Sequence, residues 1–244
     1  MDRDAYQLMA SIERDHWWYR ARREFISAAF ARVGLPAGAK LLDAGCGTGG
    51  SLPMLSSFGA VHAFEYDAGA MAIAASQNVG NVSQGSLPDG IPFPGMQFDA
   101  IGLFDVLEHL ERPVESLVAL RDRMADGGAL VLTVPAYKWL WGPHDRIHNH
   151  IRRYTASTLA QHLSEAGLRI EYLSYFNALL LPLAIVQRLR ERLFGYSFEK
   201  LSPRPAINEL LYRLWRVERH WIPRRELPFG LSLMAIARKA DRTA

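Results

Sequence analysis

The chain has 244 residues, 49% of them hydrophobic and 22% charged, which is enough to bury the core of a large α/β domain and excludes a disordered polypeptide. Its formal net charge of +3 includes no run of five or six like charges, so we expect no nucleic-acid partner. The longest apolar run, 178–186, is too short to span a bilayer.

The cysteine content and the N-terminus favour a cytoplasmic location. Cys46 is the only cysteine, so this sequence cannot form an internal disulfide. The first residues, MDRDAYQLMA, lack the order of basic and then apolar residues that marks a signal peptide. Both features fit a protein of a reducing compartment.

The first element expected along the chain is a helix within residues 1–35. The segment ERDHWWYRARREF leads into it, and its apolar positions include Phe25, Ala29 and Phe30. This spacing predicts an amphipathic helix that packs one face on the rest of the domain.

From residue 39 onward, apolar runs alternate with helical patterns. The runs, each of which predicts a strand, are 39–44, 59–67, 97–105 and 128–135. The helical patterns are 50–58, 68–77 and 113–124, the last beginning at Pro113. This alternation predicts a mostly parallel sheet with helices on both faces and ligands bound beyond the carboxyl ends of its strands.

Two further strands, 169–176 and 230–239, are separated by about fifty residues. Within this insertion, 179–200 and 207–226 are apolar at helical spacing, with arginines on the other side. We therefore divide the chain into an N-terminal helical segment (1–35), an α/β core (36–177), a helical insertion (178–228) and a last strand with its tail (229–244).

The glycine-rich stretch LLDAGCGTGG fits two different cofactor loops. Gly45, Gly47 and Gly50 match the G-x-G-x-x-G of a dinucleotide site, whereas Gly45, Gly47 and Gly49 match G-x-G-x-G with Asp43 before them. An acid beside the loop would repel a pyrophosphate but would favour the sulfonium and ammonium of S-adenosylmethionine. Asp43 therefore favours S-adenosylmethionine over NAD.

Several motifs after this loop agree with that choice. LLDAGCGTGG, AFEYD, SQGSLP, FDAIGLFDVLEHL and DGGALVLTVP follow one another between Leu41 and Pro135. In this order they resemble the class I S-adenosylmethionine-dependent methyltransferases of the small-molecule type. The resemblance implies a Rossmann-like sheet of seven strands, preceded by a helical lid.

The resemblance also implies which residues surround the cofactor. These are Asp43, Gly45, Gly47, Gly49, Glu65, Tyr66, Ser86, Leu87, Phe104 and Asp105. Glu65 would bind the ribose, and Tyr66 would flank the adenine. Ser86 departs from the aspartate common in relatives, and a hydroxyl is a weaker acceptor for the adenine amino group than a carboxylate. His109 is expected to pack in the cofactor pocket.

In related methyltransferases the N-terminal segment often closes over the cofactor. Aromatic faces attract a sulfonium, and a guanidinium binds a carboxylate. We predict this role for Trp18 and Arg22, one helical turn apart. The alternative is a helix that only packs on the domain.

Residues 136–170 contain the histidines that could assist transfer. A residue with a pKa near neutrality can accept the proton of a hydroxyl acceptor, and His144 and His148 are the candidates. We expect no metal, although these two side chains would share a face if the segment were helical. Transfer by positioning alone, without a base, stays open.

The sequence thus predicts a methyltransferase that acts on a small-molecule or lipid-like acceptor, with oxygen as the favoured atom. An N-methyltransferase of small molecules is the alternative within the class; outside it stand a non-catalytic S-adenosylmethionine-binding regulator and an NAD-dependent oxidoreductase. Residues 178–226 contain ten Lys and Arg against five Asp and Glu, so peripheral membrane contact through the insertion is a further hypothesis. Helices that only cap the core are the competing one.

Overall fold

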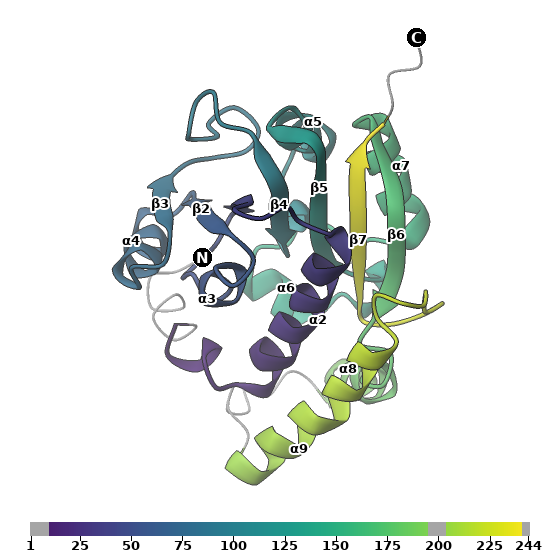
Figure 1. Ribbon diagram of the computed structural model, residues 1–244. Helices are drawn as coiled ribbons and strands as arrows, with labels where there is room; N and C mark the ends of the chain where they lie inside the picture. Colours follow the sequence, from purple (N-terminus) through teal and green to yellow (C-terminus); the bar gives the residue numbers. More distant parts are fainter. Residues whose placement is uncertain (1–9, 195–203, 241–244) are drawn as a thin grey trace.

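The computed structural model describes residues 10–194 and 204–240, without the side chains of His144, Arg192 and Phe194. Its centre is a seven-stranded sheet with the order β3-β2-β1-β4-β5-β7-β6 (Figure 1). The strands are β1 (Lys40–Ala44), β2 (Ala60–Glu65), β3 (Asn81–Gln84), β4 (Phe98–Phe104), β5 (Met124–Pro135), β6 (Leu168–Phe176) and β7 (Ser232–Lys239). Only β7 runs antiparallel to its neighbours in this sheet.

Both faces of the sheet are buried, as expected for parallel strands. One hydrophobic core cluster lies on each face of the sheet. Successive residues of a strand point into opposite clusters, so that Leu41 belongs to the first and Leu42 to the second. The helices of the first cluster are α2 (Trp17–Val33), α3 (Leu52–Leu55), α4 (Ala68–Ser76) and α9 (Pro205–Arg216). Those of the second are α5 (Pro113–Asp122) and α7 (Ala156–Glu165).

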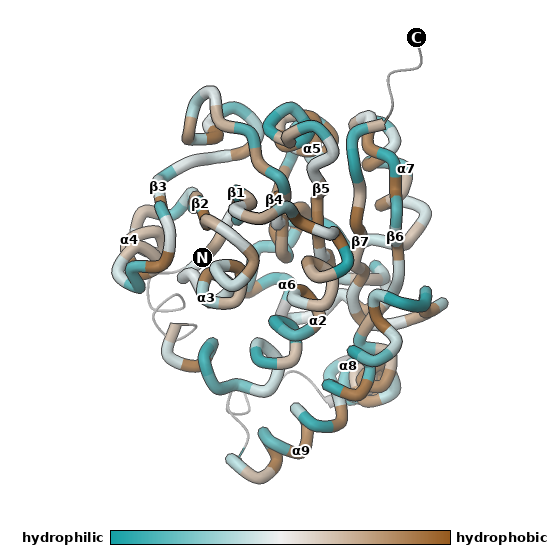
Figure 2. The backbone as a smooth tube through the Cα atoms, viewed as in Figure 1, coloured by the Kyte–Doolittle hydropathy of each residue, from teal (hydrophilic) through white to brown (hydrophobic). Residues whose placement is uncertain are grey.

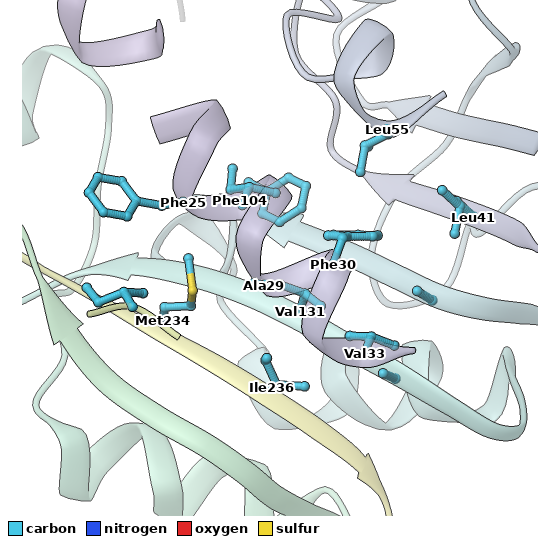
Figure 3. Packing of buried hydrophobic residues seen from close by; sticks show 14 of the residues in the cluster. Phe25, Ala29, Phe30, Val33, Leu41, Leu55, Phe104, Val131, Met234 and Ile236 are labelled. Atoms are coloured by element: carbon cyan, nitrogen blue, oxygen red, sulfur yellow. The ribbon is translucent and has the colours of Figure 1, made fainter. Parts of the chain in front are cut away.

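Helix α2 forms much of the first layer. Phe25, Ala29, Phe30 and Val33 are buried against strand residues such as Val131 (Figure 3). Their spacing of three and four residues places them on one face of the helix. The amphipathic helix expected within residues 1–35 is therefore present, and its C-terminal half is part of the core.

The α/β fold expected from the sequence is confirmed, with three differences in detail. Strand β3 has no counterpart among the predicted runs, because it is a short edge strand of the sequence NVSQ. The helix expected over 50–58 covers only Leu52–Leu55. The helix expected over 113–124 ends at Asp122, since Met124 already pairs with Phe98 in the sheet.

The segment between β6 and β7 contains α8 (Leu181–Phe194), α9 (Pro205–Arg216) and the short helix η3 (Val217–His220). Figure 1 places α9 beside α2, at the end of the sheet where the parallel strands finish. In Figure 2, apolar and polar residues alternate along α9. The division of the chain into four segments stays a prediction.

None of the helices in residues 10–194 and 204–240 is both long and apolar enough to cross a membrane.

Candidate active site

The glycine turn follows directly from β1. Gly45, Gly47 and Gly49 have φ angles of 78°, 56° and 89°, a region that L side chains rarely adopt. A Cβ on Gly45 would lie 2.8 Å from Cγ2 of Val106. The turn therefore needs glycine both for its backbone angles and for the close approach of Val106.

Glu65 ends β2 beside this turn. Its Oε2 accepts a hydrogen bond from the Gly47 N–H at 2.9 Å, and its Oε1 accepts from the Asp67 N–H at 3.0 Å. Each carboxylate oxygen keeps a lone pair for a further donor. The structure thus brings Glu65 to the glycine turn, where the sequence predicts the ribose.

A cavity of about 320 Å³ opens next to Glu65 and is lined by Tyr66, Gln84, Gly85 and Ser86. The Tyr66 side chain is 77% exposed. Gln84 and Gly85, at the end of β3, were not among the predicted residues. The two expected adenine neighbours, Tyr66 and Ser86, therefore lie at one cavity, while Leu87 packs partly buried against the second core cluster.

The N-terminal segment reaches the far side of the glycine turn. Glu13 accepts a hydrogen bond from the Thr48 hydroxyl at 2.6 Å, and its side chain occupies the space beside Gly50. Burial raises the pKa of Glu13, although Thr48, Arg22 and Arg23 act in the opposite direction. Neither Glu13 nor Thr48 was predicted, because nothing in their local sequences indicates a contact across 35 residues.

Arg22 forms an ion pair with Asp105, which follows β4. Among the described residues, Arg22 Nε and Asp43 Oδ2 are buried without a hydrogen-bond partner. Burial raises the pKa of Asp43 to about 7, against the nearby positive charge of Arg22. The structure therefore brings together Arg22, Asp43 and Asp105, three residues that the sequence predicted in the site. Within the described chain, Arg22 and Asp43 each keep a polar atom without a hydrogen-bond partner.

Trp18, the other predicted lid residue, stacks on Trp215 of α9, with ring centroids 4.6 Å apart and planes inclined by 28°. The neighbouring Trp17 N–H donates to Asn208 Oδ1 at 2.8 Å, and Arg20 pairs with Glu209 at 3.0 Å. Helix α9 therefore braces the start of α2, the segment that holds Arg22 against Asp105.

A larger cavity, of about 930 Å³, is lined by residues of α2 and of the α9–η3 segment. Arg20 and Arg219 line it and pair with Glu209 and Glu24, respectively. Arg23, Arg32 and Arg224 line the same cavity, where Glu24 is the one acid among the lining residues, so its wall is predominantly basic.

A buried aspartate, Asp145 of α6 (Pro143–Ile147), contacts a histidine and an arginine that follow the helix. Asp145 accepts hydrogen bonds from His150 Nδ1 at 2.9 Å and Arg153 Nε at 2.7 Å. Burial opposes ionisation of Asp145, yet the hydrogen bonds from His150 and Arg153 hold its pKa below the ordinary value. Asp145 thus orients His150, a residue the sequence analysis did not select.

Two more histidines adjoin His150. The ring centroid of His109, in the helical turn η1 (Leu107–His109), lies 4.8 Å from that of His150, and the centroid of His148 lies 6.1 Å from it. Burial, with a smaller contribution from His150, lowers the pKa of His109 to about 4 and also lowers that of His148. The predicted His148 is therefore in the cluster, whereas the side chain of His144 lies outside the described part.

Glu108 completes this cluster. Its side chain is fully buried, and burial followed by the charge of Asp105 raises its pKa well above the ordinary value. Ligand atoms of Glu108, His109 and His150 lie within 4.8 Å of one another, close enough for these groups to hold a metal ion. That donor set differs from the His144 and His148 pair weighed on sequence grounds, and the expectation of no metal stays a prediction.

Comparison with known proteins agrees with this geometry. The sequence profile of a methyltransferase-domain family matches residues 16–173. The mitochondrial ubiquinone biosynthesis O-methyltransferase of Schizosaccharomyces pombe is 30% identical over 127 residues, which are 48% of this chain and 46% of that protein. The chain spans less than half the length of the curated relatives it matches.

Two solved structures share the fold over most of the chain. The methyltransferase in complex with the Trm112 methyltransferase activator of Haloferax volcanii has a TM-score of 0.64 and 15% identity, and the match covers 99% of both chains. Haemonchus contortus phosphoethanolamine N-methyltransferase 2, solved with S-adenosyl-L-methionine, has a TM-score of 0.58 and 14% identity, over 88% of this chain and 52% of that one.

The fold and the glycine turn define a class I S-adenosylmethionine-dependent methyltransferase. The chain belongs to the methyltransferase-domain family, and its cofactor is S-adenosyl-L-methionine. The residues present fit that cofactor, because the unsatisfied Arg22 Nε and Asp43 Oδ2 beside the glycine turn complement a carboxylate and a cation.

Proposed function

We propose that the protein transfers a methyl group from S-adenosylmethionine to a hydroxyl oxygen of a small-molecule or lipid-like acceptor. One observation supports oxygen most directly: His109, which follows β4 and Asp105, clusters with His148 and His150, which follow β5. A hydroxyl must lose its proton during methylation, whereas a neutral amine attacks with its free lone pair. The 30% identical relative is an O-methyltransferase by name.

For the cofactor, we propose the residues expected from the sequence. Asp43, Glu65 and the glycine turn would hold the methionine and ribose parts, and Arg22 would bind the carboxylate. Phe104 and Asp105 would line the same pocket, with Trp18 closing it. S-adenosylmethionine, when bound, supplies an electrophilic methyl group on a sulfonium. The chain's own part is to hold the acceptor oxygen in line with that methyl group and to exclude water.

We assign the base to His148 of the histidine cluster as the first candidate, and to His144, whose side chain lies outside the described part, as the second. Because burial lowers the pKa of His148, its imidazole is unprotonated at neutral pH and can accept a proton. His150 is a third candidate, since its Nδ1 contacts Asp145 and this contact fixes the orientation of the ring. We also propose that the protein acts in the cytoplasm.

The experiment measures methyl transfer from labelled S-adenosylmethionine to a panel of phenols, alcohols and amines, including lipid-linked ones. If His148 is the base, His148→Ala lowers turnover by about 10²–10⁴-fold and leaves cofactor affinity nearly unchanged. The same assay on His144→Ala and His150→Ala identifies the base among the three. The exposed His220 on η3 supplies the control His220→Ala, which should keep normal turnover.

Normal rates across pH in all three variants would show that positioning alone is sufficient. Transfer only to amines would instead support a small-molecule N-methyltransferase, the second candidate, which the similarity in fold to a phosphoethanolamine N-methyltransferase favours.

A further inference from the structure

Helix α9 exposes a continuous apolar stripe on its outer side. Ile207, Leu210, Leu214 and Val217 are 48%, 65%, 48% and 43% exposed. The spacing of three and four residues places Ile207, Leu210 and Leu214 on one face of α9, and Val217, the first residue of η3, continues the stripe. A helix face that only contacts solvent needs no such row of large apolar side chains.

The stripe is not needed to hold α9 on the protein. The opposite side of the helix buries Tyr212 and Trp215 in the first core cluster, where Trp215 contacts Trp17, Trp18 and Phe25. The hypothesis of helices that only cap the core thus explains the inner face of α9 alone. Four outward apolar side chains remain to be explained.

Helix α8 repeats the pattern. Its outward apolar residues, together with Leu179 two positions before the helix, are Leu183, Val186, Leu189 and Leu193, and all five are 41–74% exposed. The start of the α8 segment meets the end of α9, because Glu218 Oε1, next to Val217, accepts a hydrogen bond from the Leu179 N–H at 2.6 Å. We call the outward residues of both helices together the insertion face.

Two exposed arginines lie on this face or at its edge. At 100° per residue, Arg190 falls on the arc of α8 occupied by Leu183, Val186 and Leu193. Arg204 precedes Ile207 at the start of α9. Both arginines are exposed, and within residues 10–194 and 204–240 neither has an ion-pair partner. Arg188, in contrast, lies on the inner side of α8, where it pairs with Glu191 and contacts Gly142.

We propose that the insertion face docks on the surface of an anionic lipid bilayer. Amphipathic helices with basic residues among their apolar ones bind in the plane of such a surface, because apolar burial and attraction to anionic headgroups act together. The lengths of α8 and α9 allow them to lie in the interface but not to cross it.

Docking would also place the start of α2, the predicted lid, near lipid. The inner side of α9 contacts Trp17 and Trp18, and one turn further along α2, Arg22 contacts Asp105 at the active site. A bilayer against the outer side of α9 would therefore lie one helix away from the lid. The docking proposal does not depend on the identity of the methyl acceptor, because binding to a bilayer needs neither cofactor nor turnover.

The test is co-sedimentation of the full chain with vesicles of phosphatidylcholine alone or with added phosphatidylglycerol, at low and high salt. We expect binding to the anionic vesicles at low salt and its loss at high salt. Leu210→Ser with Leu214→Ser, and separately Arg190→Ala with Arg204→Ala, should each weaken binding about tenfold or more. Thermal unfolding and cofactor binding should stay unchanged in both double variants, because these side chains point away from the core.

The matched control is Lys40→Ala with Arg169→Ala, which removes two exposed cations at the opposite end of the sheet. This control should bind like the original protein. Absence of binding to anionic vesicles at low salt would overturn the proposal. So would a dimer in light scattering that Leu210→Ser with Leu214→Ser converts to a monomer without any vesicle binding, because a second copy would then cover the face. Methyl transfer to acceptors in solution, measured separately, tests the proposed function without reference to docking.

Discussion

Removal of the Arg22 charge is the most informative perturbation of the site. Arg22→Gln keeps a long polar side chain but breaks the ion pair with Asp105. It also removes the positive charge that lowers the pKa of Asp43, so that pKa should rise above its present value of about 7. The variant therefore tests whether Arg22 holds together the acids around the glycine turn.

The expected loss follows from burial. Breaking a fully buried ion pair costs about 3–5 kcal/mol, because the remaining charge is left without compensation. The Arg22 side chain is 14% exposed, but that of Asp105 is 34% exposed, so solvent screens part of the interaction. We expect Arg22→Gln to lower the free energy of unfolding by about 2–3 kcal/mol.

The assay is denaturant unfolding at pH 7 of Arg22→Gln, Asp105→Asn and the double variant. A coupling energy of about 1 kcal/mol or more between the two positions is expected. The control is Arg112→Gln, since Arg112 pairs with Asp89 and Glu115 at the surface, where the side chains are 48%, 76% and 60% exposed. Its loss should stay below about 1 kcal/mol.

The cofactor supplies a second readout. If Arg22 binds its carboxylate, Arg22→Gln should also weaken S-adenosylmethionine affinity in calorimetry by about tenfold or more, a charge-assisted hydrogen bond being worth about 1.5–3 kcal/mol. A variant as stable as the control, with no coupling to Asp105 and unchanged affinity, would refute the assignment of Arg22 to the site.

Three further predictions concern the turn, the lid and pH. Gly45→Ala should abolish most cofactor binding with the fold retained, because its Cβ would meet Val106 and its φ of 78° disfavours alanine; calorimetry with S-adenosylmethionine and circular dichroism check this. Trp215→Ala should lower the free energy of unfolding by about 3–5 kcal/mol, and Trp215→Phe by clearly less, in urea titrations; equal losses in the two would contradict packing as the cause. The pKa of His109 is 6.5 in the unfolded chain but about 4 in the folded protein. Protonation of His109 therefore lowers the free energy of unfolding as the pH drops from 6.5 toward 4, and has no effect on it above this window. Urea unfolding at pH 7 and pH 5 should show a smaller acid loss in His109→Asn, and an identical loss in both proteins would contradict the burial argument.

The fold and the cofactor were predictable because their signals are local. Strands such as β1 and β4 are runs of apolar residues, and the spacing of Gly45, Gly47 and Gly49 records a backbone turn that other residues cannot adopt. Strand β3 escaped detection because its sequence, NVSQ, has no apolar run. Its place is decided by pairing with β2 at the edge of the sheet.

The details of the site depend on contacts between distant parts of the chain. Trp18 meets Trp215, Glu13 meets Thr48, and His109 meets His150, each pair brought together by the packing of different elements. No periodicity or spacing indicates such pairs. The sequence could therefore identify histidines as base candidates, but only folding decided that Asp145 orients His150.

The helical insertion also shows which features the sequence determined and which only packing decided. Its sequence specified two amphipathic helices with arginines, because hydrophobic periodicity is a property of neighbouring residues. It could not determine which apolar residues face inward, since both sides of α9 contain them. Packing against α2 buries Tyr212 and Trp215 and leaves Leu210 and Leu214 in solvent, because a helix on the surface of a core can bury only the side that faces it.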